Sequence, residues 1–309
     1  MKPRSSRNKT IQLSVEEKSY FGKKILKESS SYTERKIENQ VLCGDSIKVL
    51  PQLPKEFIDL VVTDPPYNMT KIYAGEKFSK TNAEEYELWL RSWIEPLIPL
   101  LKPNASLYVC TEWQCSSIVE KVLRDYFYVR NRITWEREKG RGAQHNWKNA
   151  AEDIWFCTVS NDYYFNADAV RLKRKVIAPY RHVNGDPKDW ADEGDEKFRL
   201  TAPSNLWTDI SVPFWSMPEN TEHPTQKPEK LIAKLILASS KEGDFVFDPF
   251  LGSGTTAVTA KKLSRRFAGI EREKDYALLA LKRLQTAEKY PEIQGFKDGC
   301  FWERNTRPL

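Results

Sequence analysis

The stretch Ile58-Asp59-Leu60-Val61-Val62-Thr63-Asp64-Pro65-Pro66-Tyr67 decides the fold of this chain. Its first six residues form a short, mostly apolar run, which predicts a buried strand. Proline has no backbone N–H and holds the residue before it extended, so the turn presents carboxylate and carbonyl acceptors with few competing donors. Tyr67 adds a ring on which a flat group can stack. The turn suits a planar group that bears an NH2, such as the exocyclic amine of a nucleobase, although Asp-Pro and Pro-Pro also occur in loops without chemistry.

A second strand and turn lie far along the chain. Phe245-Val246-Phe247-Asp248-Pro249-Phe250 is a short apolar run, and Leu251-Gly252-Ser253-Gly254-Thr255-Thr256 leads from it into a predicted helix over residues 257–263. Glycines let the backbone approach a ligand, and the first amides of a helix are free to donate. The spacing lacks the third glycine of the dinucleotide fingerprint, and no Gly-Lys-Ser/Thr follows. The pattern therefore disfavours NAD and a phosphate-binding loop.

The next predicted strand covers residues 266–270 and is followed by Glu271. An acid at the tip of the second strand of a βαβ unit is well placed to accept hydrogen bonds from ribose hydroxyls. The alternative is a solvated charge that opens the next helix. We prefer the ribose role, because the glycine turn lies one strand upstream. These residues together indicate a nucleoside cofactor without phosphates.

The motifs resemble those of the DNA amino-methyltransferases, which use S-adenosylmethionine to methylate exocyclic nitrogens. The resemblance covers about residues 40–285. Residues 64–67 resemble the catalytic motif of that family, and residues 248–254 resemble its cofactor motif. A third stretch, Glu222-His223-Pro224-Thr225-Gln226-Lys227-Pro228, is similar to the segment that precedes the cofactor strand. The catalytic motif comes first, as in the beta class of the family, and the likeness is greatest to the adenine-N6 enzymes of restriction–modification systems.

The resemblance implies an α/β fold: a doubly wound, mostly parallel, seven-stranded, Rossmann-like methyltransferase sheet with a circularly permuted motif order and an inserted target-recognition region. We assign catalysis to Asp64, Pro65, Pro66 and Tyr67. We assign cofactor binding to Asp45, Thr225, Gln226, Lys227, Asp248, Phe250, Gly252, Ser253, Gly254, Thr255 and Glu271. Asp45 can also cap a helix. Lys227 suits the cofactor carboxylate by its charge. His223, in the third motif, fits a structural role as well as a functional one.

The expected reaction is direct methyl transfer from S-adenosylmethionine to the N6 of an adenine flipped out of duplex DNA. The Asp64 carboxylate and the Pro65 carbonyl would accept the two N–H groups of the amine, and Tyr67 would stack on the base. Asp64 fits the adenine group, whereas many cytosine-N4 enzymes have Ser there, so cytosine remains an alternative. A nucleic-acid-binding protein of this fold without catalysis is a second possibility. A dinucleotide oxidoreductase is a third, which the missing third glycine disfavours.

The chain divides into five predicted segments. They are a basic N-terminal arm (1–36), a catalytic half (37–160), a target-recognition region (161–221), a cofactor-binding half (222–288) and a C-terminal tail (289–309). The arm is either a mobile segment in contact with DNA or a disordered tail. Basic residues interleaved with aromatic ones suit contacts to phosphates and bases. The predicted DNA-binding residues are Arg137, Lys139, Arg141, Arg171, Lys173, Arg174 and Lys175.

Composition narrows the function classes further. The formal net charge of +6 has the sign that suits a phosphate-bearing partner. The chain has no apolar run long enough for a membrane span and no secretory signal. Its five cysteines form no C-x-x-C pair and its three histidines are scattered, so we expect no metal site and reduced thiols in a cytoplasm. Duplex DNA is the expected partner, with a homodimer and a cognate restriction endonuclease as further expectations.

Strands are also predicted at residues 40–43, 106–110, 132–135 and 152–159, with helices over 83–101 and 116–126. Strands that alternate with helices predict a largely parallel sheet covered on both faces. If residues 245–250 lie beside residues 58–63 at its centre, both turns meet at the carboxyl ends of adjacent strands. We therefore predict that Asp64 and Gly252 are spatial neighbours.

Overall fold

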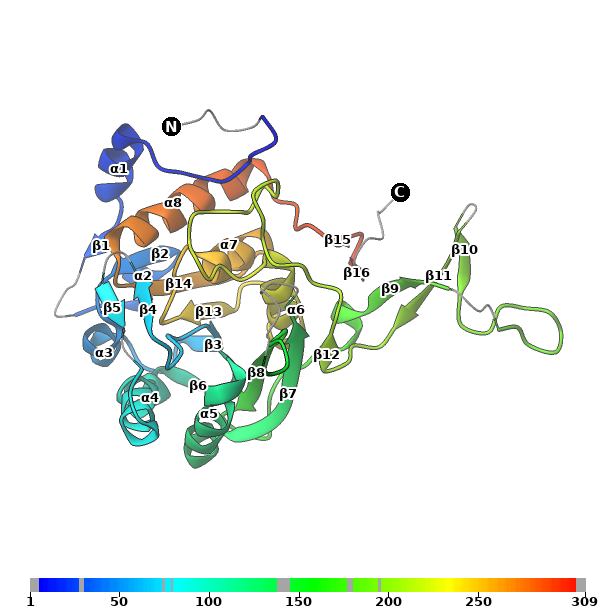
Figure 1. Ribbon diagram of the computed structural model, residues 1–309, viewed down its shortest axis with the longest axis horizontal. Coiled ribbons are helices and arrows are strands. Elements are labelled where there is room, and N and C mark those ends of the chain that lie inside the picture. The colour runs from blue at the N-terminus through cyan, green and yellow to red at the C-terminus, as the bar shows by residue number, and fades with distance from the viewer. Residues whose placement is uncertain are drawn as a thin grey trace.

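The structure is a computed structural model and describes residues 6–27, 31–73, 76–78, 80–137, 145–176, 180–193 and 196–303. Within these residues the central sheet has nine strands (Figure 1). Their order is β1 (Leu26–Lys27), β2 (Gln40–Cys43), β14 (Arg266–Glu271), β13 (Phe245–Asp248), β3 (Ile58–Thr63), β6 (Leu101–Thr111), β8 (Ala151–Thr158), β7 (Tyr128–Glu136) and β12 (Leu206–Trp207). Strand β8 runs antiparallel to both of its neighbours, and the other pairs are parallel.

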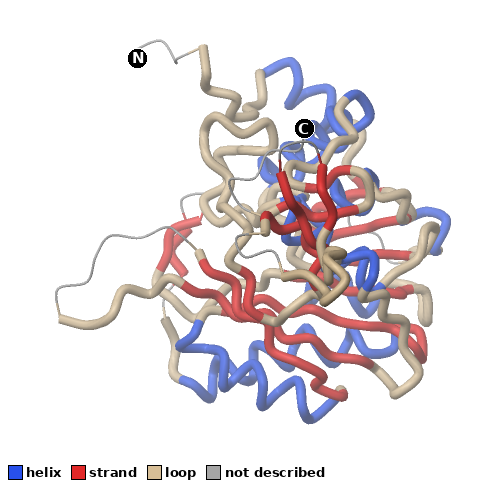
Figure 2. The backbone as a smooth tube through the Cα atoms, turned by 90° about the vertical axis from the view of Figure 1, so that its right-hand side faces the viewer, coloured by secondary structure: helices blue, strands red, loops and turns tan. Residues whose placement is uncertain are grey.

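Helices cover both faces of this sheet, as Figure 2 shows. The core on one face includes residues of α2 (Glu34–Ile37), α3 (Ser46–Val49), α4 (Ala83–Leu97) and α5 (Trp113–Tyr126). The core on the other face includes residues of α1 (Val15–Gly22), α6 (Glu229–Ser239), α7 (Thr255–Lys262) and α8 (Lys274–Lys289). The doubly wound α/β prediction is therefore confirmed. The two-residue edge strands β1 and β12 extend the seven predicted strands, and such short segments show no periodicity from which to predict them.

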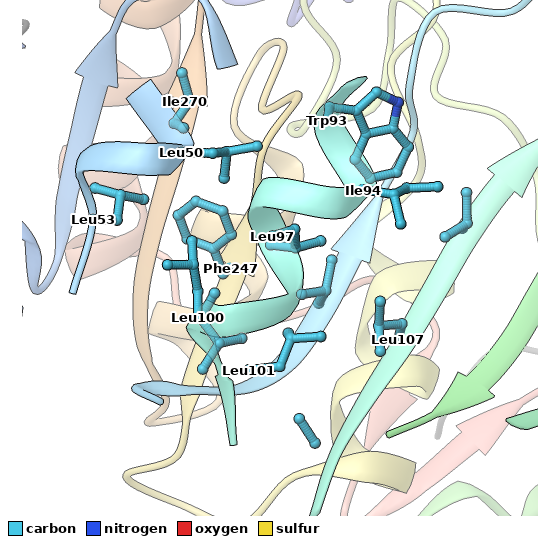
Figure 3. Close-up of a cluster of buried hydrophobic side chains, with 14 of the residues drawn as sticks. Leu50, Leu53, Trp93, Ile94, Leu97, Leu100, Leu101, Leu107, Phe247 and Ile270 are labelled. Carbon is cyan, nitrogen blue, oxygen red and sulfur yellow. The ribbon is translucent and has the colours of Figure 1, made fainter. Parts of the chain in front are cut away.

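The centre of the sheet places the two predicted motifs side by side. Strand β13 pairs in parallel with β3, with Val246 opposite Leu60 and Phe247 opposite Val61. Both strands are almost entirely buried because helices cover both faces. Figure 3 shows Phe247 and Ile270 packed with Trp93 and Leu97 of α4 in the core of one face. Because the strands are parallel, the turns that follow them emerge at the same edge of the sheet.

A second sheet lies to one side of the first (Figure 1). Its strand order is β10 (Ala191–Glu193), β11 (Glu196–Thr201), β9 (Leu172–Lys175), β16 (Cys300–Trp302) and β15 (Phe296–Lys297). The description of residues 289–309 as a tail is wrong for its described part, because β16 pairs with β9 and buries Phe301 and Trp302. This pairing joins residues far apart in sequence, so local patterns do not reveal it. The structure also contains a hairpin of β4 (Lys71–Tyr73) and β5 (Glu76–Phe78), and the short helices η1 (Leu50–Gln52), η2 (Ile98–Leu100) and η3 (Asp168–Val170).

The prediction of a mobile arm or disordered tail is also wrong for residues 6–27. Helix α1 in this segment begins with a capping box, in which Ser14 and Glu17 satisfy each other's backbone N–H groups. Its charges are paired with helix α8: Lys18 lies 2.6 Å from Asp275, and Glu17 lies 2.7 Å from Lys282. The basic composition therefore hides a helix that buries Phe21 in the core and pairs its charges with those of α8.

The turn after β13 depends on close packing at Gly254. This residue has a φ of +86° at the N-terminus of α7. A Cβ atom placed on it would lie 2.6 Å from the Cβ and 2.9 Å from the Cα of Ala280 in α8. Contacts this short do not occur between carbon atoms, so helices α7 and α8 can approach each other here only because this residue is glycine.

We expect Gly254→Ala to lower the free energy of unfolding by roughly 1–3 kcal/mol more than a change of backbone conformation alone would. Gly243→Ala is the matched control, because Gly243 has a φ of +82° but no atom within 4 Å of an added Cβ. The control isolates the cost of a left-handed alanine, about 1–2 kcal/mol. Urea unfolding measures both variants, and equal losses would contradict the packing role of Gly254.

Candidate active site

A cavity of about 220 Å³ lies where the turns after β3 and β13 meet. Asp64 and Gly252 both line it, which confirms that these residues are neighbours. Fourteen of the predicted catalytic and cofactor residues line the cavity: Asp45, Asp64, Pro65, Pro66, Tyr67, Thr225, Gln226, Lys227, Asp248, Phe250, Gly252, Ser253, Thr255 and Glu271. Gly254 does not, because its position is used for the contact with α8. Parallel pairing thus brings three separate sequence motifs into one site.

The Asp64 carboxylate receives two hydrogen bonds from other side chains of the site. The Tyr67 hydroxyl donates to Asp64 Oδ1 at 2.6 Å, and Lys227 Nζ donates to Asp64 Oδ2 at 2.5 Å. Lys227 also donates to the Tyr67 hydroxyl at 3.1 Å. The ammonium that we expected to bind the cofactor carboxylate is paired with the catalytic motif in this structure.

The network contains an acid that was predicted only as part of a strand. Glu152 is 4% exposed, and its Oε2 lies 3.1 Å from Lys227 Nζ and 3.2 Å from the Tyr67 hydroxyl. Its Oε1 lies 2.5 Å from Arg137. Because β8 is antiparallel, the amino end of β8 lies at the edge where the parallel strands β3 and β6 end. The pair Glu152-Asp153 at the start of an apolar strand was the signal available in the sequence.

Burial and charge act against each other in this network. Burial favours a raised pKa for Glu152, but the cations Lys227 and Arg137 hold this pKa below its usual value. Burial opposes the charge of Lys227, but Asp64 and Glu152 raise its pKa above the usual value for lysine. Burial, together with Asp64 and Glu152, raises the pKa of Tyr67 well above its usual value. Lys227 is thus an ammonium and Tyr67 a neutral hydrogen-bond donor.

The glycine turn is held by the acids on either side of it. Gly252 has a φ of +55°, and its amide donates to Glu271 Oε2 at 2.7 Å. The amide of Glu273 donates to the other oxygen of Glu271 at 2.7 Å. Asp248 accepts from the Phe250 amide at 2.9 Å and the Thr256 hydroxyl at 2.7 Å. Burial raises the pKa of Glu271 to about 7 and that of Asp248 to about 6.

The third motif, residues 222–228, provides a wall of the cavity. A Cβ on Gly252 would come within 3.1 Å of His223 Nε2, so the two segments are in close contact. Burial lowers the pKa of His223 to about 4, which leaves the ring neutral, and the ring packs edge-on against Tyr276 at 4.5 Å. Gln226 donates to the carbonyl of Glu219 at 2.7 Å, and its side-chain oxygen accepts from Thr221 at 2.6 Å. The side-chain amide of Gln226 therefore stabilises its own segment.

Polar contacts with neighbouring residues fix the other predicted cofactor residues, Ser253, Thr255 and Asp45. Arg283, 2% exposed, donates to the Ser253 carbonyl at 3.0 Å and to the Thr255 hydroxyl at 2.9 Å. Thr255 in turn donates to the Lys227 carbonyl at 3.2 Å, which connects the turn to the third motif. Asp45 caps α3 by accepting from the Ile47 amide at 3.0 Å while also lining the cavity, so both roles considered for it remain compatible.

The lining of the cavity suits a nucleoside. Apolar side chains (Ile47, Trp89, Phe250, Leu251 and Ile270) supply surfaces on which a flat ring can pack. Glu271, a carboxylate beside a backbone that glycine brings close, supplies the acceptor that ribose hydroxyls need. Trp89 was predicted only as part of a helix, yet its ring lies 5.7 Å from that of Phe250. A nucleoside cofactor therefore fits the residues present.

The predicted DNA-binding residues that the structure describes lie at two places: Arg137 directly after β7, and the others in or next to β9. Arg137 contacts Glu152, and Lys139 and Arg141 lie outside the described residues. In β9 and the residue before it, Arg171 pairs with Asp168 at 2.7 Å, and Lys173 lies 4.5 Å from the Trp302 ring. Lys175 is exposed, and Arg174 lies 3.8 Å from Glu303. Two tryptophans of the predicted target-recognition region are buried: Trp207 packs in the core of the central sheet, and the Trp190 indole donates to the Tyr180 carbonyl at 2.8 Å.

Two further findings concern the described residues alone. None of their helices combines the length and apolarity needed to cross a membrane. Their histidines, cysteines and acids form no cluster with the geometry of a metal site.

Comparisons with known proteins agree with this geometry. Residues 58–282 match the DNA methylase family. The type II methyltransferase M.HpaI of Haemophilus parainfluenzae is 34% identical to this chain over 263 residues, covering 84% of this chain and 77% of the relative. The DNA adenine methyltransferase YhdJ of Escherichia coli strain K12 is 31% identical over 257 residues, covering 81% and 84%.

Solved structures share the fold. The crystal structure of the M1.HpyAVI–SAM complex superposes with a TM-score of 0.54 at 24% identity, covering 79% of this chain and 98% of that one. The cytosine-N4-specific PvuII DNA methyltransferase superposes with a TM-score of 0.59 at 19% identity, covering 79% and 85%. Because the family match spans most of the sequence and includes the three motifs that meet at the cavity, this chain belongs to the DNA methylase family.

Proposed function

We propose that this protein transfers a methyl group from S-adenosylmethionine to the N6 of an adenine flipped out of duplex DNA, as the modification enzyme of a restriction–modification system. The observation that carries this proposal is that Asp64-Pro65-Pro66-Tyr67 and the Gly252 turn line one cavity in a chain of the DNA methylase family. The adenine specificity named for the relative YhdJ favours adenine over cytosine. A homodimer and a partner endonuclease remain predictions.

The cofactor end of the cavity would hold S-adenosylmethionine through this chain's own residues. Glu271 accepts from the ribose hydroxyls, and Phe250 and Trp89 pack against the adenine ring. The turn at Gly252 and Ser253, with Thr225, flanks the amino-acid part. When bound, S-adenosylmethionine supplies a methyl group on a positively charged sulfur, which an amine can attack directly.

Asp64 and Pro65 prepare the target amine. The lone pair of the adenine amino nitrogen is delocalised into the ring, so this nitrogen is a poor nucleophile. Hydrogen bonds from its two N–H groups to the Asp64 carboxylate and the Pro65 carbonyl favour a pyramidal nitrogen and expose the lone pair. The carboxylate also stabilises the positive charge that develops on the nitrogen during transfer. As the nitrogen–carbon bond forms, the sulfur–carbon bond breaks and its electron pair returns to sulfur. The nitrogen then passes its extra proton to the Asp64 carboxylate or to water.

Tyr67 and the cavity position the base. Flipping a base out of the duplex costs a few kcal/mol. Stacking on the Tyr67 ring, at roughly 1–3 kcal/mol per base, offsets part of this cost. Holding the amine in line with the methyl carbon contributes up to ~7–11 kcal/mol through proximity and orientation. Most of the rate therefore comes from placement, which fits a site built from rigid strand ends.

Incubation with methyl-labelled S-adenosylmethionine and mixed-sequence DNA, followed by digestion to nucleosides, tests the proposed function. We expect the label in N6-methyladenine, because Asp64 and the adenine-specific relative favour this base. Label in N4-methylcytosine would show that the target base is cytosine and not adenine. DNA binding without transfer would contradict an enzymatic function altogether.

Asp64→Asn tests the assigned acceptor. We expect methyl transfer to fall by at least about 10²-fold, because the amide lacks the charge and one of the acceptors. Cofactor affinity, measured by calorimetry, should stay within about tenfold of the wild-type value. Asp59→Asn is the matched control: Asp59 lies on β3, the strand that Asp64 follows, but it pairs with Lys102 at 2.8 Å and does not line the cavity. Wild-type turnover of the Asp64 variant would contradict the assigned role.

The pKa of Glu271 predicts a pH dependence of cofactor affinity. With a pKa of about 7, this carboxyl is mostly ionised at about pH 8 and mostly protonated at about pH 6. The ionised form is the better acceptor, so S-adenosylmethionine affinity should fall about tenfold as the pH falls across this range. Glu271→Gln should abolish most of this slope. Glu271→Gln retains Asp248, whose pKa is about 6. If cofactor affinity depends on pH in this variant as it does in the wild type, the dependence comes from Asp248 and not from Glu271.

A further inference from the structure

The acceptor that the target amine needs is already occupied by a cation. Lys227 Nζ lies 2.5 Å from Asp64 Oδ2, and the Tyr67 hydroxyl takes up Oδ1. The lysine side chain is 8% exposed, so water cannot replace Asp64 as its partner at little cost. A carboxylate oxygen can accept two hydrogen bonds, but the ammonium offsets the negative charge of Asp64, so Asp64 Oδ2 is a weaker acceptor for an N–H group while Lys227 stays on it.

Glu152 offers that ammonium a second carboxylate. Its Oε2 lies 3.1 Å from Lys227 Nζ, and it projects from β8, whereas Asp64 follows β3. Arg137 binds the other oxygen of Glu152 at 2.5 Å, which holds the carboxylate in place. Lys227 can thus move toward Glu152 and remain paired throughout.

Asp153, the residue after Glu152 on β8, is a buried acid with different partners, and the comparison shows what is particular to Glu152. Asp153 is buried as well, but it accepts hydrogen bonds from two hydroxyls, those of Ser116 at 2.8 Å and Thr134 at 3.0 Å. Adjacent residues of a strand point to opposite faces, so Asp153 is directed away from the face on which Glu152 meets Lys227. Of these two acids, Glu152 is the one in contact with the Lys227 ammonium.

We propose that Glu152 is a positioning residue, which takes over the Lys227 ammonium when the target amine binds Asp64. This inference rests on the proposed function. Lys227 keeps Asp64 paired in the free protein, and its transfer to Glu152 opens Asp64 Oδ2 for the amine. Without the negative charge of Glu152, the ammonium would have to stay on Asp64 or be left unpaired in a buried site, and both disfavour binding of the base.

The test compares kcat and KM for DNA at saturating cofactor in four proteins: wild type, Glu152→Gln, Lys227→Met and the double variant. Asp153→Asn is the control for neutralising a buried acid on the same strand. We expect Glu152→Gln to lower kcat/KM for DNA by about tenfold or more. The double variant should be several-fold more active than Glu152→Gln, because the ammonium that competes for Asp64 is gone. Because removing both partners of a buried ion pair can also restore folding, urea unfolding of the same proteins separates a recovery of kcat/KM from a recovery of stability.

Calorimetry of S-adenosylmethionine binding without DNA provides a second readout. We expect Glu152→Gln and Lys227→Met to retain cofactor binding. If Glu152→Gln does not fold, Glu152→Asp takes its place, because it keeps the charge but withdraws it from Lys227. A double variant no more active than the Glu152 variant, or loss of cofactor binding in Lys227→Met, would overturn the inference. Absence of transfer by the wild type would instead overturn the proposed function.

Discussion

The parallel pairing of β13 with β3 is the constraint on which the site depends. This register brings the ends of two strands from opposite halves of the sequence to the same edge of the sheet. Residues 64–67 then face the turn at Gly252, and the segment before α6 lines the same cavity. The circular permutation of the motifs changes the order in which the strands are made but not their neighbours. The sheet therefore supports the same crevice whichever motif comes first.

Charge balance is the second requirement of this crevice. Arg137, Glu152, Lys227 and Asp64 form a row of alternating sign, and the Tyr67 hydroxyl lies between the two acids, 2.6 Å from Asp64 and 3.2 Å from Glu152. A buried charge without a partner is costly, so each member of the row stabilises the charged form of the next. The same balance explains why a lysine expected to bind the cofactor lies on the catalytic acid. Lys227 lies within ion-pair distance of two carboxylates of the protein, Asp64 and Glu152.

Local sequence patterns were sufficient for the seven longer strands of the central sheet and for the two turns, and the family resemblance supplied the third motif. Strand β3 begins and ends where the apolar run does, and the motif positions place Asp64 and Gly252 correctly. Long-range pairing was not accessible in the same way. Glu152 enters the site because β8 is antiparallel, and β16 joins a sheet from a segment that looks like a tail. Helix α1 was not predicted, because a charged segment near the N-terminus is typical of a tail. The charges that pair with it lie in α8, far along the sequence.

Helix α6 contacts both sheets. Lys227 reaches Asp64 just before this helix begins, and within its first two turns Lys230 and Lys234 lie 2.8 and 2.9 Å from Asp209, which follows β12. Lys230 also donates to the carbonyl of Trp302 in β16 of the second sheet. Burial lowers the pKa of Lys234 to about 8, while the two lysines hold the pKa of Asp209 below its usual value, so this cluster is strongly coupled. Because a buried charge without a partner is costly, these pairs hold α6, the segment after β12 and β16 together. The lysine that pairs with Asp64 and the two lysines that bind the second sheet and Asp209 therefore lie on one continuous segment, residues 227–234.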